Sequence, residues 1–581
     1  MRALVGRFMS RPQSEVQEMA AVIPDQPQQL MSGEDLKHEI GFLGLLWASE
    51  GSIIGSGWLF AALLALTIAG PGALVAWVIA SVIVIVIALV YAELGGMFPV
   101  SGGGGLFPQY AFGNLAGASF GWFAYIQAAA YAPIEVLAAL EYMSTAEWAK
   151  GFYNPSNGTL PGKGIAVAIG LMAVFTVINL VGIRWVDRAN TGLTILKVVL
   201  PLLAVVVLVS THFHPGNFTA GGGFFPKGLS IPKTLMTVIP EGGIVFAFTG
   251  FEQATQIGGE SRNPQRDLPW AVIGSVLIAV IIYILVQLAF IGALNPATIA
   301  HFHTWANLVK DGPLEASPYY TLASVAGLAW LAWILRFSAV VSPGSCGLIY
   351  ITTTSRISYG MSLDGYLPKA FEQTSERTKI PVFSVIVAFI LGCLFLLPFP
   401  SWGKLVSVVT SATVLMYVGA PLALGALRKN SADLRRSYRL PAAGFLAPVA
   451  FVFSTLIVYW AGWQTYSTLM VAVVIGYVLM LVSRIFGLNE KAPKIEWASA
   501  KWLFPYLIGL GVISYFGGFG QGGIIGGVSS LKTVLVGGNA DLPLYWDVLV
   551  ITIFSLAIYY LAMASRLSAE KVSEYTKDVW A

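Results

Sequence analysis

Apolar runs of about 20 residues recur along this chain, and each is long enough to cross the ~30 Å hydrocarbon core of a bilayer. Hydrophobic residues make up 56% of the 581 positions and charged residues only 11%, whereas soluble proteins average about 25% charged residues. In lipid the backbone must satisfy its own polar groups, so such runs fold as transmembrane helices. We expect about fourteen, at 40–65, 72–94, 114–142, 164–183, 191–210, 237–258, 270–293, 320–353, 382–399, 404–427, 442–462, 466–486, 502–518 and 546–563. The sequence therefore predicts an all-α integral membrane protein.

The orientation of the chain follows from its basic residues, which are concentrated in every second connection between the predicted spans and at both ends. Because cytoplasmic connections are enriched in lysine and arginine, both termini are expected in the cytoplasm. Residues 1–38 form a polar tail too long to be a cleaved signal, and residues 564–581 form a second tail. The formal net charge of +4 reflects this topology, and we expect no nucleic-acid partner.

The first run is interrupted in its middle by the segment Glu50–Gly57, which reads EGSIIGSG. Glycine weakens a helix, and an acid at the bilayer centre costs roughly 2.5–3.5 kcal/mol on insertion scales. A second break, Phe246–Glu252, interrupts the sixth run. Breaks are tolerated where the freed backbone faces protein or a water-filled cavity, and a matched pair indicates a transporter binding site.

The two broken spans are five apart, so they cross the membrane in opposite directions, as in an inverted repeat. We expect repeat 1 over 39–210 (spans 1–5), an external loop over 211–236, and repeat 2 over 237–427 (spans 6–10). Spans 11–14, over 442–563, lie outside this 5+5 repeat. They are expected to serve packing, lipid contact or a homodimer.

Each break offers backbone groups to a ligand. The half-helix after the first break exposes the amides of Gly55–Gly57, which can hold a carboxylate with the Ser52 hydroxyl nearby. Carbonyls freed around Ile53 and in the Phe246–Phe248 segment suit an ammonium group. The alternative is close helix packing, since Gly51 and Gly55 have Gly-x-x-x-Gly spacing; the partner break favours binding.

These segments resemble the signature of the amino acid–polyamine–organocation (APC) superfamily. Its pattern is matched, in order across spans 1–10, by Gly51–Gly57, Tyr91–Leu94, Phe246–Glu252, Glu260, Asn263-Pro264, Ser355-Arg356 and Asp364-Gly365. The resemblance implies a LeuT-like fold, alternating access and amino-acid substrates. The continuation Trp58-Leu59-Phe60 and the expected fourteen spans look most like the aspartate:proton symporter branch. Glu93 and Glu260 are expected to pair with cytoplasmic bases.

Two basic residues lie inside predicted spans. Family members similar in span 5 place a lysine like Lys197 where others bind sodium, which implies proton coupling; the alternative is a lysine that snorkels to an interface. Arg336 in span 8 departs from the family's apolar pattern, and its guanidinium can grip the side-chain carboxylate of an acidic substrate. It could equally form a structural ion pair with Glu50, Glu135 or Glu241, and both readings stay open.

Several acids and aromatic residues are candidates for coupling or gating. Gln127, Tyr131 and Glu135 share one face of span 3, which indicates an inward polar stripe. Glu252 matches the family's acid after the second break, which is linked there to gating or pH response. The predicted substrate-binding residues are Ser52, Ile53, Gly55, Ser56, Gly57, Phe246, Ala247, Phe248, Thr249, Gly250 and Arg336. The predicted proton-coupling or gating residues are Lys197, Glu50, Glu135, Glu241, Glu252, Trp58 and Phe251, although ordinary packing explains any single aromatic residue.

The sequence thus predicts a proton-coupled amino-acid symporter of the plasma membrane that prefers acidic substrates such as aspartate or glutamate. Its expected partners are amino acids, protons and membrane lipids. Rivals of the same fold are an amino-acid or polyamine exchanger and an inorganic-ion transporter; Arg336 and Lys197 argue against a polyamine carrier. A non-transporting amino-acid receptor is the rival from a different class. No nucleophile–base arrangement survives the topology, so we expect no enzyme, and we expect no cofactor or metal.

Overall fold

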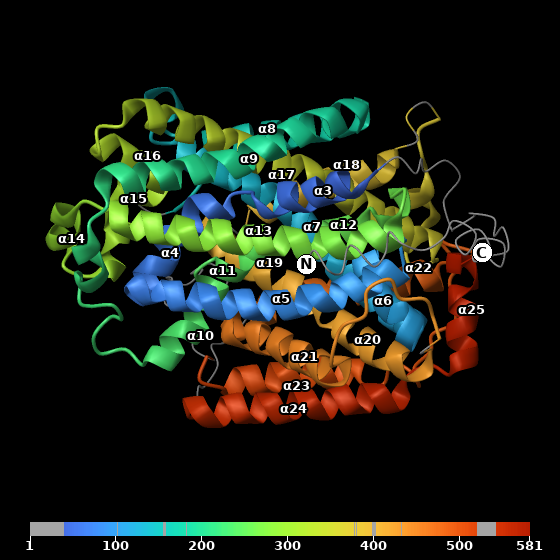
Figure 1. The fold of residues 1–581 in the computed structure, drawn as a ribbon. Helices are drawn as coiled ribbons and strands as arrows, with labels where there is room; N and C mark the ends of the chain where they lie inside the picture. Colours follow the sequence, from blue (N-terminus) through green and yellow to red (C-terminus); the bar gives the residue numbers. More distant parts are fainter. Residues whose placement is uncertain are drawn as a thin grey trace, which may run out of the picture.

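The computed structural model describes residues 40–100, 103–154, 158–181, 183–376, 378, 380–397, 402–431, 433–519 and 542–580. The protein is 79% helix, and no strand occurs in these ranges. The α-helices are α3 (Phe42–Ile53), α4 (Gly57–Ala69), α5 (Ala73–Met97), α6 (Gly103–Phe112), α7 (Asn114–Met143), α8 (Gly162–Val181), α9 (Ile183–His212), α10 (Ile231–Glu241), α11 (Ile244–Phe248), α12 (Gln253–Gln256), α13 (Pro264–Ala293), α14 (Pro296–Phe302), α15 (Gly312–Ala316), α16 (Pro318–Val325), α17 (Ala329–Leu363), α18 (Val382–Leu396), α19 (Trp402–Tyr417), α20 (Gly419–Asn430), α21 (Ala443–Trp460), α22 (Gly462–Ile485), α23 (Leu503–Phe516), α24 (Leu544–Ser565) and α25 (Ala569–Trp580). Most of the long ones run side by side in one elongated bundle (Figure 1).

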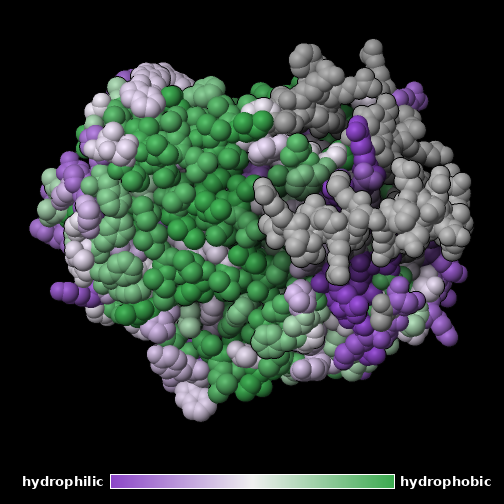
Figure 2. Space-filling view, in the orientation of Figure 1, coloured by the Kyte–Doolittle hydropathy of each residue, from purple (hydrophilic) through white to green (hydrophobic). Residues whose placement is uncertain are grey.

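The helices have the length and composition of a multi-pass membrane protein. Within the described ranges, 10 helical stretches are long and apolar enough to cross a membrane, and α18 and α23 are shorter apolar helices. Apolar side chains cover a broad flank of the bundle, and hydrophilic residues gather toward its ends (Figure 2). The prediction of an all-α membrane protein is confirmed. The expected number of fourteen spans stays a prediction, because the halves of the broken spans are too short to be counted singly.

Two predicted spans are divided differently from the expectation. The sixth run was expected over 237–258, but it starts earlier, with α10 at Ile231, and consists of three short helices. Gly243 separates α10 from α11 with a positive φ of 74°, a conformation that glycine adopts without strain. The eighth run was expected to be continuous over 320–353. Instead α16 ends at Val325, Gly327 turns the chain with a φ of 73°, and α17 begins at Ala329.

Helix α7 is the centre of the bundle. The most apolar 18-residue window of α7 is 100% buried, whereas that of α22 is 22% buried. α7 packs against α17, α19 and α6, and α13 packs against α5, α3 and α9. Helices α21, α23 and α24 lie along one side of the bundle, where α21 contacts α10 and α19 (Figure 1). This packing places both breaks in the interior.

Candidate functional site

The first break separates α3 from α4. The residues Ile54–Ser56 leave the helical path, and the Gly55 amide donates to the Ile53 carbonyl at 3.0 Å. The chain resumes its helix at Gly57, so the first amides of α4 have no helical carbonyl to donate to. The break predicted at Gly51–Gly57 is therefore present, although the helix continues as far as Ile53 before it opens.

The second break lies directly against the first. α11 ends at Phe248, and α12 begins at Gln253. Gly250 has a φ of 115°, and a Cβ on it would lie 2.7 Å from the carbonyl carbon of Ser52. A Cβ on Gly57 would likewise lie 3.0 Å from the Cα of Ala247. Glycine is required at both positions because the two backbones touch there.

The carbonyls that open at the first break are capped by side chains of other helices. The donors belong to α9, α13 and α17, and each occupies one lone pair of a carbonyl that can accept two hydrogen bonds. Lys197 Nζ donates to Gly51, Cys346 Sγ to Ser52 at 3.3 Å, Tyr283 Oη to Ile53 at 2.9 Å, and Ser342 Oγ to Ile54 at 2.9 Å and to Gly55 at 3.0 Å. The sequence analysis did not single out Tyr283, Ser342 or Cys346 as site residues.

The polar stripe of α7 runs across both breaks. Gln127 Nε2 reaches Glu252 Oε1 at 3.5 Å, and the Tyr131 hydroxyl bonds to Thr249 Oγ1. One turn further on, Glu135 covers the first break, since a Cβ on Gly55 would lie 2.4 Å from Glu135 Oε1. The carboxyl group of Glu135 thus lies where the sequence analysis placed a substrate carboxylate.

Glu252 fixes the second break from within. Its Oε2 accepts hydrogen bonds from the Tyr417 hydroxyl at 2.6 Å and from the Gly250 amide at 3.0 Å. The Phe251 ring beside it is fully buried and lies 5.0 Å from the Tyr417 ring and 5.6 Å from the Tyr91 ring. On this side the break is closed by aromatic rings.

On the other side, Trp402 closes the breaks from the first residue of α19. Its Nε1 donates to Ser56 Oγ at 2.7 Å, and its ring lies 5.6 Å from Phe246 and 5.1 Å from Phe60. The sequence analysis proposed Trp58 as an occluding ring, but Trp58 packs against Tyr319 at 5.4 Å. Trp402 occupies the position over the break, and sequence reasoning missed it.

Lys197 belongs to the interior of the protein. Its exposed fraction is 1%, which excludes the snorkelling alternative. Lys197 interacts electrostatically with Glu50 and Glu135, and the ion pairs within 4.0 Å found in the described ranges do not include it. Glu50 is fully buried, and neither of its carboxylate oxygens has a hydrogen-bond partner among the residues that the structure describes. One ammonium group and two carboxyl groups therefore form a buried cluster against the first break.

Arg336 lies away from both breaks. It donates from Nη2 to Thr145 Oγ1 at 3.1 Å, and its guanidinium stacks 3.7 Å from the Tyr320 ring centroid. Among the described residues it forms no ion pair with the three acids proposed as partners, and one of these, Glu241, has an unpartnered Oε2 in α10. Arg336 precedes Ser342 by six residues, which is about 9 Å along a helix.

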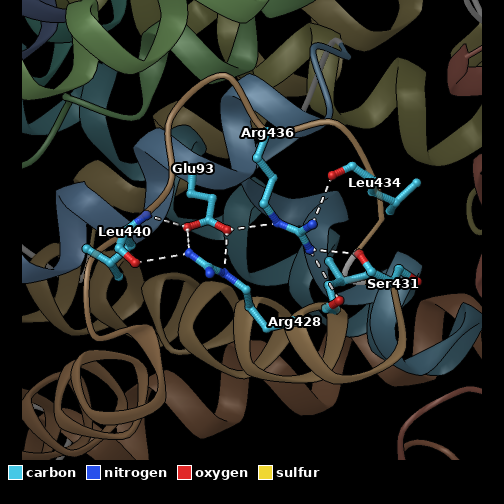
Figure 3. A network of polar contacts seen from close by, with 7 residues as sticks. Glu93, Arg428, Ser431, Leu434, Arg436 and Leu440 are labelled. Atoms are coloured by element: carbon cyan, nitrogen blue, oxygen red, sulfur yellow. Dashed lines mark hydrogen bonds and ion pairs between the residues drawn. The ribbon is translucent and has the colours of Figure 1, made fainter.

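At one end of the bundle, ion pairs connect residues of different helices and loops. Glu93 on α5 accepts hydrogen bonds from Arg428 at 2.7 and 2.6 Å and from Arg436 at 3.0 Å (Figure 3). Glu260 pairs with Arg356 at 2.5 Å. The expected pairing of both acids with basic residues is confirmed. No group of three or more potential metal ligands occurs in the part of the chain that the structure describes.

The chain is similar to known proteins along most of its length. The model of the amino acid permease family matches residues 40–480. The glutamate/serine transporter AimA of Bacillus subtilis (strain 168) is 35% identical over 554 residues, which cover 94% of this chain and 96% of that protein. The aspartate-proton symporter of the same organism is 32% identical over 535 residues, or 92% of this chain and 97% of that protein. The branched-chain amino acid permease BcaP of the same organism is 28% identical over 476 residues, which cover 77% of this chain and 93% of that protein.

Proposed function

The chain belongs to the amino acid permease family, and from this membership we propose that it is a proton-coupled symporter of acidic amino acids in the plasma membrane, with both termini in the cytoplasm. Membership makes it a multi-pass membrane protein that transports amino acids, and the family consists of transporters rather than enzymes. The observation that carries the finer proposal is the buried cluster of Lys197, Glu50 and Glu135 beside two touching helix breaks.

The substrate would bind through the groups that all amino acids share. Its α-carboxylate would accept from the Ser56 and Gly57 amides at the start of α4, where the helix dipole favours an anion. Its ammonium group would donate to the Ala247 and Phe248 carbonyls, which open at the end of α11, because the Ile53 and Phe246 carbonyls each already accept two hydrogen bonds. Because Trp402 covers Ser56, the substrate enters only after Trp402 has moved away.

Proton coupling would arise because the carboxyl groups of Glu135 and of the substrate would occupy neighbouring positions at the first break. Glu135 lies against Gly55, so a substrate carboxylate at the neighbouring amides would sit next to it. Two carboxylates in one buried site repel unless one of them is protonated. Substrate binding is therefore expected to require a proton in the Glu135, Glu50 and Lys197 cluster, and transport would carry that proton across.

Lys197→Ala tests the coupling. In proteoliposomes, we expect this variant to lose the uptake that an imposed pH gradient drives, while exchange of labelled for unlabelled substrate persists. The control is Lys150→Ala, which removes an exposed lysine that pairs with Glu147. Gradient-driven uptake by Lys197→Ala at the wild-type rate would contradict the coupling role.

The acidic preference is supported by the two relatives named for glutamate/serine and for aspartate, and we assign Arg336 a part in it. At a separation of about 9 Å, the rise along α17 from Arg336 to Ser342, one charge contributes roughly 0.5–2 kcal/mol of attraction for effective dielectric constants of 80 to 20. Arg336→Ala should therefore lower aspartate uptake relative to serine uptake by roughly 2- to 20-fold. Arg336→Lys keeps the charge and should keep most of the preference. If Arg336→Ala lowers aspartate and serine uptake equally while the protein is still in the membrane, Arg336 does not contribute to substrate selectivity.

Symport and exchange are separated by one panel of measurements. Purified protein in liposomes is given labelled amino acids at two imposed pH gradients, with and without unlabelled substrate inside. A symporter accumulates acidic substrates in empty liposomes as the gradient rises. Uptake only into preloaded liposomes would instead identify an exchanger, and binding without uptake would identify a receptor.

A further inference from the structure

A pocket lined by arginine lies outside the transport site, at the end of the bundle that carries the Glu93 network. It encloses about 450 Å³ and is lined by Arg428, Arg439, Leu440, Pro441, Ala442, Ala443 and Gly444. Arg428 lies in the last turn of α20, residues 439–442 belong to the connection that follows, and Ala443 and Gly444 begin α21. Helix α21 is long enough to span the membrane. The pocket therefore lies where a spanning helix leaves the apolar flank.

The arginines around this pocket outnumber the acids. Glu93 is the one carboxylate shared by Arg428 and Arg436, and its four accepted hydrogen bonds come from these two side chains and from the Leu440 amide (Figure 3). Burial lowers the pKa of Arg436, and the neighbouring Arg428 and Arg439 act in the same direction, against Glu93. Arg428 and Arg436 thus share Glu93, Arg439 lies close enough to act on Arg436, and the residues that line the pocket include two arginines and no acid, so the pocket is positively charged.

Several hydrogen-bond donors at the pocket have no acceptor within the described chain. Arg428 bonds through Nε and Nη2 and leaves Nη1 without an acceptor. Arg439 is exposed and makes no hydrogen bond or ion pair. The Ala443 and Gly444 amides open the 18-residue helix α21 and likewise have no acceptor. Guanidinium groups and free amides at a helix start are the donors that phosphate oxygens prefer.

We propose that this pocket binds a phosphate-bearing anion, the headgroup of an anionic membrane phospholipid. The lipid is favoured over free phosphate because Phe445, one residue beyond the pocket, is 68% exposed in the first turn of a spanning helix. An acyl chain can lie along Phe445 while the headgroup phosphate reaches Arg439, Arg428 Nη1 and the α21 amides. Basic pockets between spanning helices are suited to such headgroups.

The test measures binding to the full chain in detergent, independently of transport. Short-chain phosphatidylglycerol, phosphatidylcholine with the same chains, and inorganic phosphate are titrated separately against the thermal unfolding midpoint. Phosphatidylglycerol should raise the midpoint in a saturable way, whereas the other two should not at the same concentrations. No effect of phosphatidylglycerol, or an equal effect of phosphatidylcholine, would contradict an anion-binding pocket. An equal effect of inorganic phosphate would contradict a lipid as the ligand.

The location is tested by matched arginine variants. Arg439→Ala should weaken phosphatidylglycerol binding roughly fivefold, since one basic residue near a lipid surface contributes about 1 kcal/mol. Arg439→Glu should weaken it by roughly the square of that factor. The control, Arg435→Ala, removes another exposed charge of the same loop that does not line the pocket. Equal weakening by Arg439→Ala and Arg435→Ala would show general charge attraction and overturn the pocket.

Discussion

A single methyl group added at Gly55 should disable the transport site through Glu135. The new Cβ would lie 2.4 Å from Glu135 Oε1, 3.0 Å from its Cδ and 3.1 Å from Cys346 Sγ. Ordinary carbon–oxygen contacts are about 3.4 Å or more, so the overlap with Oε1 is roughly 1 Å, and overpacking of this kind typically costs about 1–3 kcal/mol. The cheapest relief is displacement of the Glu135 carboxyl group from the first break. We therefore expect Gly55→Ala to lower stability by that amount and, because Glu135 is moved out of the proposed coupling cluster, to reduce the uptake that a pH gradient drives.

The assay pairs uptake in proteoliposomes with thermal unfolding in detergent. Gly55→Ala with Glu135→Asp tests the cause, because aspartate is one methylene shorter and withdraws its carboxyl group from the added Cβ. This double variant should recover stability relative to Gly55→Ala alone. Gly344→Ala is the control, since a Cβ on this glycine of α17 meets nothing within 4 Å. Wild-type uptake by Gly55→Ala, or a double variant no more stable than the single one, would refute the reasoning.

Two further predictions concern Trp402, which covers the candidate site, and Asp364, a partly buried acid just after α17. Trp402→Phe keeps an aromatic ring but removes the indole N–H and its 2.7 Å hydrogen bond to Ser56. That bond is worth about 0.5–1.5 kcal/mol, so the open state should gain roughly 2- to 12-fold in population. The readout is modification of buried Cys346 by a water-soluble thiol reagent in a Cys393→Ser background, and an unchanged rate would contradict it. Burial raises the pKa of Asp364 to about 6, so the ionised group destabilises the fold above pH 6 and the cost fades as pH falls toward 4. Wild type should gain up to about 3 kcal/mol relative to Asp364→Asn between pH 7 and pH 4; unfolding midpoints that move in parallel would exclude this.

The helix breaks were predictable from the sequence because glycines within a long apolar run indicate where the helix is interrupted. Gly55, Gly57 and Gly250 interrupt apolar runs, and in the structure Gly57 and Gly250 each touch the backbone of the opposite break while Gly55 faces Glu135. The stripe of Gln127 and Glu135 was also predictable, since residues four apart share one face of a helix. In both cases the signal lies within one helix, where spacing in sequence fixes spacing in space.

The side chains that cap the breaks left no comparable signal. Tyr283 and Ser342 are ordinary residues of long helices, and only the packing of α13 and α17 against α3 points them at the opened carbonyls. Trp402 was missed because it is the first residue of its helix, outside any periodic pattern. The ion-pair reading of Arg336 assumed contact with buried acids, but its helix instead directs it to Tyr320 and Thr145.

By itself, the sequence determined that this is a membrane protein built of helices and where both helix breaks lie. Its motifs also identified the family. Long apolar runs must fold as helices in lipid, and glycine and charge within them must face the interior. Only the tertiary structure decided that Glu135 lies against Gly55, that Trp402 donates to Ser56 and that Lys197 donates to the Gly51 carbonyl. These contacts join residues far apart in the chain, so they depend on how whole helices pack rather than on any local pattern.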